Sequence, residues 1–276
     1  MSALETTHSG GETSGDSGGE SGVRAGDFRP GATLASLYPE AHAGGFSRYD
    51  GFVEFYSRVN ALLDHDSRVL DFGAGRGEWT DGRLPAYSRH LRAFHERVAE
   101  VVGVDVDDAV LQHPALAEAH VIAAPGPIPY ADASFDVVVA DYVLEHVSRA
   151  DAPAVAAELL RVLEPGGWLA ARTPNKWGVI GIGARTVPNH LHTRVLARLQ
   201  PGRKEEDVFP VEYHMNTRAD LRRLFPAPHE LVVYGHSSEP TYFGSSVPLW
   251  RVAQLVDRLT PPRLAPTLMV FVQKAR

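Results

Sequence analysis

Three glycines at alternate positions mark the first segment of the sequence that could do chemistry. They stand in VLDFGAGRG, residues 69–77, directly after a short apolar run. Glycine is needed where φ is positive or where a ligand touches the main chain, because a Cβ would block both. A helix that begins at such a turn offers unpaired N–H groups to an anion such as a carboxylate. The turn indicates a ligand-binding loop, although it suits dinucleotides as well as other ligands.

The residue at position 78 favours one kind of ligand over another. A dinucleotide fingerprint that started at Gly73 would need a small third residue at this position, which is Glu78. A glutamate there obstructs close helix–strand contact and repels a pyrophosphate. A ligand with one carboxylate, an ammonium and a sulfonium fits Asp71 and Glu78 better.

A second acidic position follows the segment VVGVDVD, residues 101–107. A carboxylate at the end of a second strand, here Asp105, can accept hydrogen bonds from both hydroxyls of a ribose. The alternative is a loop carboxylate that caps the next helix, as Asp107 or Asp108 could also do. The place of Asp105 after the glycine turn favours the interpretation that Asp105 binds the ribose. The spacing from Asp71 to Asp105 exceeds that of an ordinary strand–helix–strand unit, which predicts an insertion around residues 79–89.

Several histidines could take part in proton transfer or metal binding. His146, next to Glu145 after the fourth strand, is our first candidate for a general base, because imidazole accepts protons near neutral pH; the alternative is a packing or capping role. His214 is a second candidate, in a segment that could cover the site. His190 and His192 have metal-like spacing but no third ligand nearby, so no metal site is predicted.

The elements that must position these residues alternate between strands and helices. Such alternation predicts a doubly wound α/β fold with a parallel sheet and right-handed crossovers. The expected strands cover residues 67–72, 101–105, 120–123, 135–140, 168–172, 230–234 and 267–273. The expected helices cover residues 49–63, 88–99, 109–116, 152–163 and 217–224.

Composition suggests a tail and one domain. Residues 1–26 are rich in Gly, Ser, Thr and Glu, so we expect a disordered tail, followed by a single domain over 27–276. Two irregular segments, about 174–216 and 237–262, are predicted to be lid insertions, because long connections usually have a function and these carry large aromatic side chains.

Charge and composition exclude several classes. The net charge of −7 argues against nucleic acid as a partner. The chain has no cysteine, which excludes disulfides and thiolate chemistry. Without a secretory signal or an apolar run of membrane-spanning length, we expect a cytoplasmic protein with no membrane insertion. The oligomeric state is left open.

Four stretches in this order resemble the class I S-adenosylmethionine-dependent methyltransferases. They are VLDFGAGRG, VVGVDVD, IPYADASFDVVVADYVLEH and LRVLEPGGWL. The resemblance is specific across residues 69–175 and looser in the C-terminal strands. It implies S-adenosylmethionine as cofactor and a Rossmann-like, seven-stranded sheet with the order 3-2-1-4-5-7-6, the last strand antiparallel.

The resemblance also implies a set of cofactor-binding residues. Asp71, Gly73 and Gly75 are expected around the methionine part of the cofactor. Asp105 and its neighbour Val106 are expected at the ribose. Ile128 is expected to flank the adenine, and Asp141 and Tyr142 to lie beneath the sulfonium. The chain departs from the family at Ala124, where many members have an aspartate for the adenine amino group. Main-chain groups or Asp132 are the expected substitutes.

These features together predict methyl transfer to a small or medium-sized acceptor, most readily at oxygen. The histidine bases favour oxygen, as does the absence of an Asn-Pro-Pro-Tyr type of motif after the fourth strand. Aromatic lids suit a natural-product, sugar or lipid-linked scaffold. The alternatives are an N- or C-methyltransferase, a non-catalytic cofactor-binding scaffold and, more distantly, an NAD(P)-dependent oxidoreductase, which Glu78 disfavours.

Overall fold

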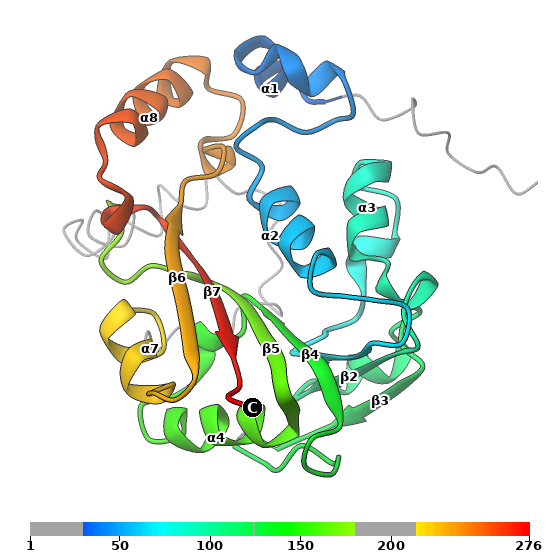
Figure 1. Ribbon diagram of the computed structural model, residues 1–276. Helices are drawn as coiled ribbons and strands as arrows, with labels where there is room; N and C mark the ends of the chain where they lie inside the picture. Colours follow the sequence, from blue (N-terminus) through cyan, green and yellow to red (C-terminus); the bar gives the residue numbers. More distant parts are fainter. Residues whose placement is uncertain (1–29, 124, 180–213) are drawn as a thin grey trace, which may run out of the picture.

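A seven-stranded sheet with the order β3-β2-β1-β4-β5-β7-β6 forms the centre of the molecule (Figure 1). The computed structural model describes residues 30–123, 125–179 and 214–276. The first five strands pair in parallel, and β7 runs antiparallel to both β5 and β6. The expected topology is therefore confirmed. The strands are β1 (Arg68–Phe72), β2 (Glu100–Asp105), β3 (Glu118–Val121), β4 (Phe135–Asp141), β5 (Leu163–Pro174), β6 (Glu230–His236) and β7 (Thr267–Gln273).

Helices cover both faces of this sheet, which explains why the central strands are apolar on both sides. In β4, Val137 and Val139 face a core with helix α2 (Gly51–Asn60) and the segment around α3 (Ala86–Arg92). Val138 faces the opposite core, with α4 (Ala152–Val162) and α7 (Arg218–Leu224).

Local capping fixes where two of these helices begin. The Asp50 carboxylate accepts hydrogen bonds from the N–H groups of Phe52 and Val53, at 2.8 and 3.0 Å. The Thr217 hydroxyl oxygen accepts one from the N–H of Asp220 at 3.0 Å. Each cap satisfies N–H groups that have no partner within the helix. Thr217 therefore sets the start of α7 at Arg218.

Two helical predictions on the β1–β2 and β2–β3 links were wrong in detail. The helix expected over 88–99 begins at Ala86, directly after Pro85, and ends at Arg92, with a 3₁₀ turn over Phe94–Glu96. The helix expected over 109–116 is a 3₁₀ helix, Asp108–Gln112, and Pro114 follows it. Proline suits the start of a helix and cannot continue one.

The segment 237–262, expected to be irregular, contains a 13-residue helix. This helix, α8 (Val247–Leu259), buries Trp250, whose indole N–H donates to the Gly244 carbonyl at 2.9 Å. A short N-terminal helix, α1 (Ala32–Leu37), was also not predicted. Short 3₁₀ turns are Pro39–His42, Glu78–Thr80, Leu144–His146, Thr241–Phe243 and Pro262–Leu264.

Some predictions fall outside the described residues. These are the tail over 1–26 and most of the first lid segment, with His190 and His192. Within the described residues, no three His, Asp or Glu side chains cluster as metal ligands would. No helix in that part of the chain has the length and apolarity to span a membrane.

Candidate active site

The glycine turn after β1 uses its glycines for two different reasons. Gly73, Gly75 and Gly77 all have positive φ, at 75°, 60° and 74°. A Cβ on Gly73 would lie 2.3 Å from a methyl group of Val143, so the protein itself needs glycine there. A Cβ on Gly75 would meet nothing within 4 Å. The space beside Gly75 is therefore open to a ligand.

The carboxylate of Asp105, at the end of β2, is held by this turn. Asp105 Oδ2 accepts a hydrogen bond from the Gly75 N–H at 2.8 Å, and Oδ1 accepts one from the Asp107 N–H at 2.9 Å. Each carboxylate oxygen has a second lone pair available. Two ribose hydroxyls could therefore donate to a carboxylate that the backbone already orients.

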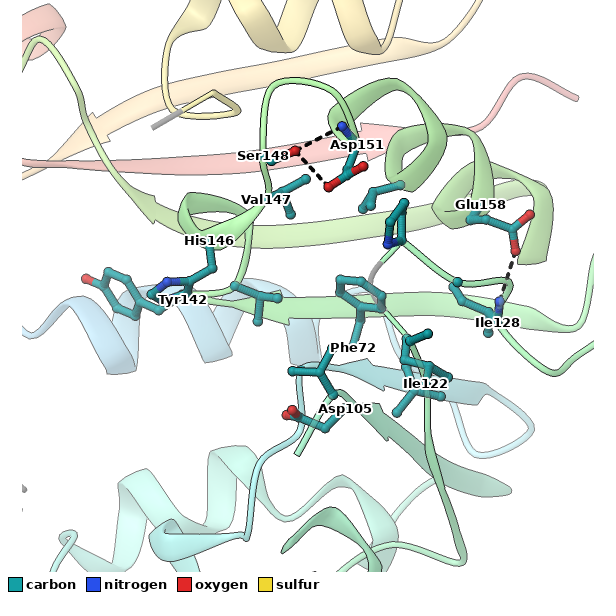
Figure 2. Close-up of a pocket in the computed structure, with 18 residues that line it drawn as sticks. Phe72, Asp105, Ile122, Ile128, Tyr142, His146, Val147, Ser148, Asp151 and Glu158 are labelled. Atoms are coloured by element: carbon teal, nitrogen blue, oxygen red, sulfur yellow. Dashed lines mark hydrogen bonds between the residues drawn. The ribbon is translucent and has the colours of Figure 1, made fainter. Parts of the chain in front are cut away.

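A cavity of about 540 Å³ opens at the carboxyl ends of β1, β2 and β4 (Figure 2). Ligands of doubly wound sheets bind in this position. Of the residues predicted for the site, those that line the cavity are Gly73, Asp105, Val106, Ile128, Tyr142 and His146. Asp71, Gly75, Asp141 and His214 are not among its lining residues.

Asp71 lies in the protein interior rather than at the cavity wall. Its Oδ2 forms an ion pair with Arg92 at 2.7 Å, and both side chains are buried. Burial, together with the negative charges of Asp141 and Asp105, raises the pKa of Asp71 to about 8. Burial lowers the pKa of Arg92 to about 10. The structure thus shows the Asp71 carboxylate held in the interior by Arg92, a partner that the sequence did not indicate.

Asp141 is likewise engaged by the protein. Its two carboxylate oxygens accept from Arg172 Nε and Nη2 at 2.7 and 2.8 Å. The Tyr56 hydroxyl donates to Oδ2 at 2.9 Å. Buried bidentate pairs of this kind fix geometry. We conclude that Asp141 orients Arg172, and a ligand would have to compete with that guanidinium for its charge.

Tyr142 adopts a backbone conformation that is rare for an aromatic residue. Its φ is 58°, and its N–H donates to the Arg172 carbonyl at 2.8 Å. The Arg172 guanidinium lies 4.7 Å from the centre of the Tyr142 ring. Strained backbone of this kind concentrates at functional sites. The ring stays 40% exposed and lies beside His146 at the cavity, as Figure 2 shows.

Glu145 and His146 are adjacent in sequence but lie in different environments. His146 lines the cavity. Glu145 is buried and accepts a hydrogen bond from Thr173 Oγ1 at 3.1 Å, and Asn216 Nδ2 donates to that same hydroxyl at 2.6 Å. Burial raises the pKa of Glu145 to about 7. His146 thus lies at the cavity wall, whereas the Glu145 side chain is directed into the interior.

The expected adenine contacts are altered. The Ile128 N–H donates to Glu158 at 3.0 Å, and the Ile128 carbonyl accepts from Arg161 at 3.0 Å, so both main-chain groups are already used. Asp132 pairs with Arg161 at 2.8 Å and does not line the cavity. The Ile128 side chain still forms part of the apolar wall.

Three polar residues at the cavity were missed by sequence reasoning, and one of them is Glu158, which accepts from the Ile128 N–H. The other two are Ser148 and Asp151, and the Ser148 hydroxyl donates to Asp151 Oδ2 at 2.7 Å (Figure 2). A serine and an aspartate just before a helix usually cap it, so the pattern gave no sign of a site. Here the Asp151 side chain forms no cap hydrogen bond with α4.

The fold and this site together define the class of proteins that bind S-adenosylmethionine on a Rossmann-like sheet. A family model described as "Methyltransferase domain" matches residues 45–227. The chain therefore belongs to the S-adenosylmethionine-dependent methyltransferase family, and S-adenosylmethionine is the cofactor that this family implies.

Curated relatives agree with the family. A protein of Mycolicibacterium smegmatis named "Probable S-adenosylmethionine-dependent methyltransferase" is 36% identical over 133 residues, 46% of either chain. A malonyl-[acyl-carrier protein] O-methyltransferase of Halorhodospira halophila is 35% identical over 116 residues, 40% of this chain and 36% of the relative. The chain thus matches less than half the length of these relatives.

A solved structure resembles the chain more distantly. It is a SAM-dependent methyltransferase from Methanosarcina mazei, with 17% identity and a TM-score of 0.47, covering 79% of this chain and 97% of its own.

The residues present fit the cofactor. The open space at Gly75 leaves the main chain accessible, and the Asp105 carboxylate lies at the cavity, where ribose hydroxyls could donate to it. Val106, Ile122 and Ile128 give an apolar wall against which a purine can pack. This combination of an apolar wall with a few fixed polar groups is characteristic of cofactor sites.

Proposed function

We propose that the protein transfers the methyl group of S-adenosylmethionine to an oxygen atom of a small or medium-sized acceptor. The observation that carries this proposal is His146, an imidazole at the wall of the cofactor cavity beside the strained Tyr142. The name of one relative, an O-methyltransferase, supports an oxygen acceptor. Nitrogen and carbon acceptors are the alternatives that the experiment must separate.

Each residue of the site has a proposed role. Asp105 accepts the ribose hydroxyls, Gly73 and Gly75 receive the methionine part along the main chain, and Val106 and Ile128 pack against adenine. Tyr142 lies against the methyl-bearing end. Asp71 and Asp141 act indirectly, because their carboxylates hold Arg92 and Arg172.

The proposed chemistry needs little from the protein beyond alignment and one proton acceptor. When bound, S-adenosylmethionine supplies a methyl group on a leaving group that is already activated. His146 accepts the proton from the acceptor hydroxyl as the oxygen–methyl bond forms. Tyr142 and Val143, also at the cavity wall, hold the acceptor in line and limit water.

The experiment is a screen with isotopically labelled methyl donor. Partly apolar hydroxyl, amine and carbon-acid compounds are offered, and NMR of the product locates the methyl group. With an acceptor in hand, we expect His146→Gln to lower turnover by roughly 10²–10⁴-fold without changing cofactor affinity.

A matched control is His42→Gln, since His42 is exposed and lies outside the cavity. This variant should keep wild-type turnover. Methylation at nitrogen or carbon would refute the oxygen assignment. Near-wild-type turnover of His146→Gln would show that His146 is not the general base. Alignment of the acceptor with the methyl donor would then have to explain catalysis.

A further inference from the structure

Buried polar atoms without partners are concentrated in one part of the molecule. Seven such side-chain atoms occur in the described residues, and six belong to the end of β1 or to the links that flank β2. The six are Asp71 Oδ1, Trp79 Nε1, Ser88 Oγ, Arg89 Nε, Arg92 Nη1 and His113 Nε2. Folded proteins leave few such groups, and a cluster of them calls for a water, an ion or a ligand.

A second cavity, of about 420 Å³, lies beside this cluster. Trp79 and Arg89, the residues that carry two of the unpartnered atoms, line it, and α3 forms one of its sides. It shares no lining residue with the cofactor cavity. It also coincides with the insertion that the long spacing from Asp71 to Asp105 predicts.

The chemistry of the lining favours an anion. Its donors are the Trp79 indole N–H, the Arg89 guanidinium and the imidazoles of His90 and His95, and the single carboxylate among the lining residues is Glu96. The surrounding field is positive as well. After burial, the charges of Arg92 and His95 are what lower the pKa of nearby His113, to about 4.

The glycine turn holds this second cavity in shape. A Cβ on Gly77 would lie 2.9 Å from both His113 and Pro114, so the loop that follows can pack there only with glycine. That loop carries Trp79, whose ring centre lies 6.1 Å from that of His113 and 6.3 Å from that of His95. The donors are thus placed by packed rings and by a helix.

We propose that this cavity binds the phosphate group of a small organic molecule. The Arg89 guanidinium and the Trp79 N–H donate to phosphate oxygens, and the indole ring packs against the organic part. A phosphate is preferred over a carboxylate because its three terminal oxygens match donors on four side chains, and guanidinium binds phosphate in a bidentate manner. The site is separate from the cofactor cavity.

Isothermal titration with phenyl phosphate, benzoate and inorganic phosphate tests the proposal. Each titration is done with and without saturating S-adenosylhomocysteine, so that binding in the cofactor cavity is recognised. We expect saturable binding of phenyl phosphate under both conditions, and weaker binding of the other two. Arg89→Gln should weaken it at least tenfold, and Trp79→Phe, which keeps a ring but removes the N–H, several-fold.

The matched control is Arg83→Gln, on the same insertion. Arg83 is exposed, pairs with Asp81 at 2.7 Å and does not line the cavity. It should bind phenyl phosphate as the wild type does, and every variant should keep wild-type affinity for S-adenosylhomocysteine. Three results would overturn the proposal. The first is that phenyl phosphate shows no saturable binding, and the second is that benzoate binds more tightly than phenyl phosphate. The third is that Arg89→Gln and Trp79→Phe both bind phenyl phosphate as tightly as the wild type does, which would indicate an adventitious ion only. The unchanged cofactor affinity keeps this outcome distinct from a failure of the methyl-transfer proposal.

Discussion

The two sides of the cofactor cavity are built in different ways. On the β1–β2 side, main-chain geometry makes the site: positive φ at Gly75 and its N–H hydrogen bond fix the Asp105 carboxylate. On the β4 side, side chains from distant segments decide which residue faces the ligand. Tyr56 and Arg172 engage Asp141, and Thr173 engages Glu145.

This difference explains which site residues can be predicted from sequence. A glycine spacing reports local backbone shape, so it is readable wherever it occurs. The orientation of Asp141, Tyr142 and Glu145 depends on partners up to 125 residues away in the chain. We expect substitutions on the β4 side to reach the whole fold, and those at Gly75 and Asp105 on the β1–β2 side to act mainly on the ligand.

The largest effect should follow from Arg172→Met, which leaves the Asp141 carboxylate buried without its ion-pair partner. Breaking one half of a buried pair costs about 3–5 kcal/mol in the free energy of unfolding. Urea denaturation measures this cost. The double variant with Asp141→Asn should recover much of it, and exposed Arg149→Met should cost little. A loss below about 1 kcal/mol for Arg172→Met would mean that this pair does not organise the β4 side.

Gly73→Ala and Gly75→Ala should separate the two reasons for glycine in one turn. The methyl group at position 73 meets Val143 and also carries the penalty of positive φ, so we expect a loss of about 2–4 kcal/mol in stability. At position 75 only the φ penalty of about 1–2 kcal/mol applies. Gly75→Ala should nevertheless lose most of its affinity for S-adenosylhomocysteine by calorimetry. Equal stability losses would contradict the distinction.

Glu145→Gln should change the pH dependence of stability. Because folding raises the pKa of Glu145 from 4.5 to about 7, the unfolded chain ionises first, and the wild type loses stability as pH rises between these values. The loss in the free energy of unfolding reaches about 3 kcal/mol above pH 7 and vanishes below pH 4.5. The variant should therefore exceed the wild type by up to that amount at pH 8 and match it near pH 4.5. Exposed Glu164→Gln is the control, and a pH-independent difference would show that Glu145 is not responsible.

The smallest of these effects concerns the β1–β2 side. Asp105→Ala should weaken cofactor binding by about 1.5–3 kcal/mol, which is the scale of hydrogen bonds to a charged group. Calorimetric titration with S-adenosylhomocysteine provides the measurement. Since the Gly75 and Asp107 N–H groups can turn to water, stability should fall less than affinity does. An affinity change within a few tenths of a kcal/mol would exclude Asp105 as the ribose acceptor.

Most of the fold was accessible from sequence, because apolar alternation and turn residues fix strands independently of their neighbours. The strand order came from the family resemblance and is confirmed by the pairing of β7 between β5 and β6. Helix α8 was missed because Pro248 and the polar residues around it resemble a loop, and only Trp250 is buried. Arg92 and Arg172 lay within expected elements, where nothing in the local pattern marks an arginine as the partner of a buried carboxylate.

The position of β7 has a consequence for how the chain acquires its fold during synthesis. In β7, Val272 pairs with Leu169 of β5 on one side and with Leu231 of β6 on the other. While translation has not yet passed β6, both β5 and β6 have an edge without a neighbour, which invites pairing with other nascent chains. Strand β7 pairs with β5, which lies far from it in the sequence, and contacts between distant segments form slowly during folding. We therefore expect the nascent chain to be most prone to strand mispairing before β7 has been synthesised.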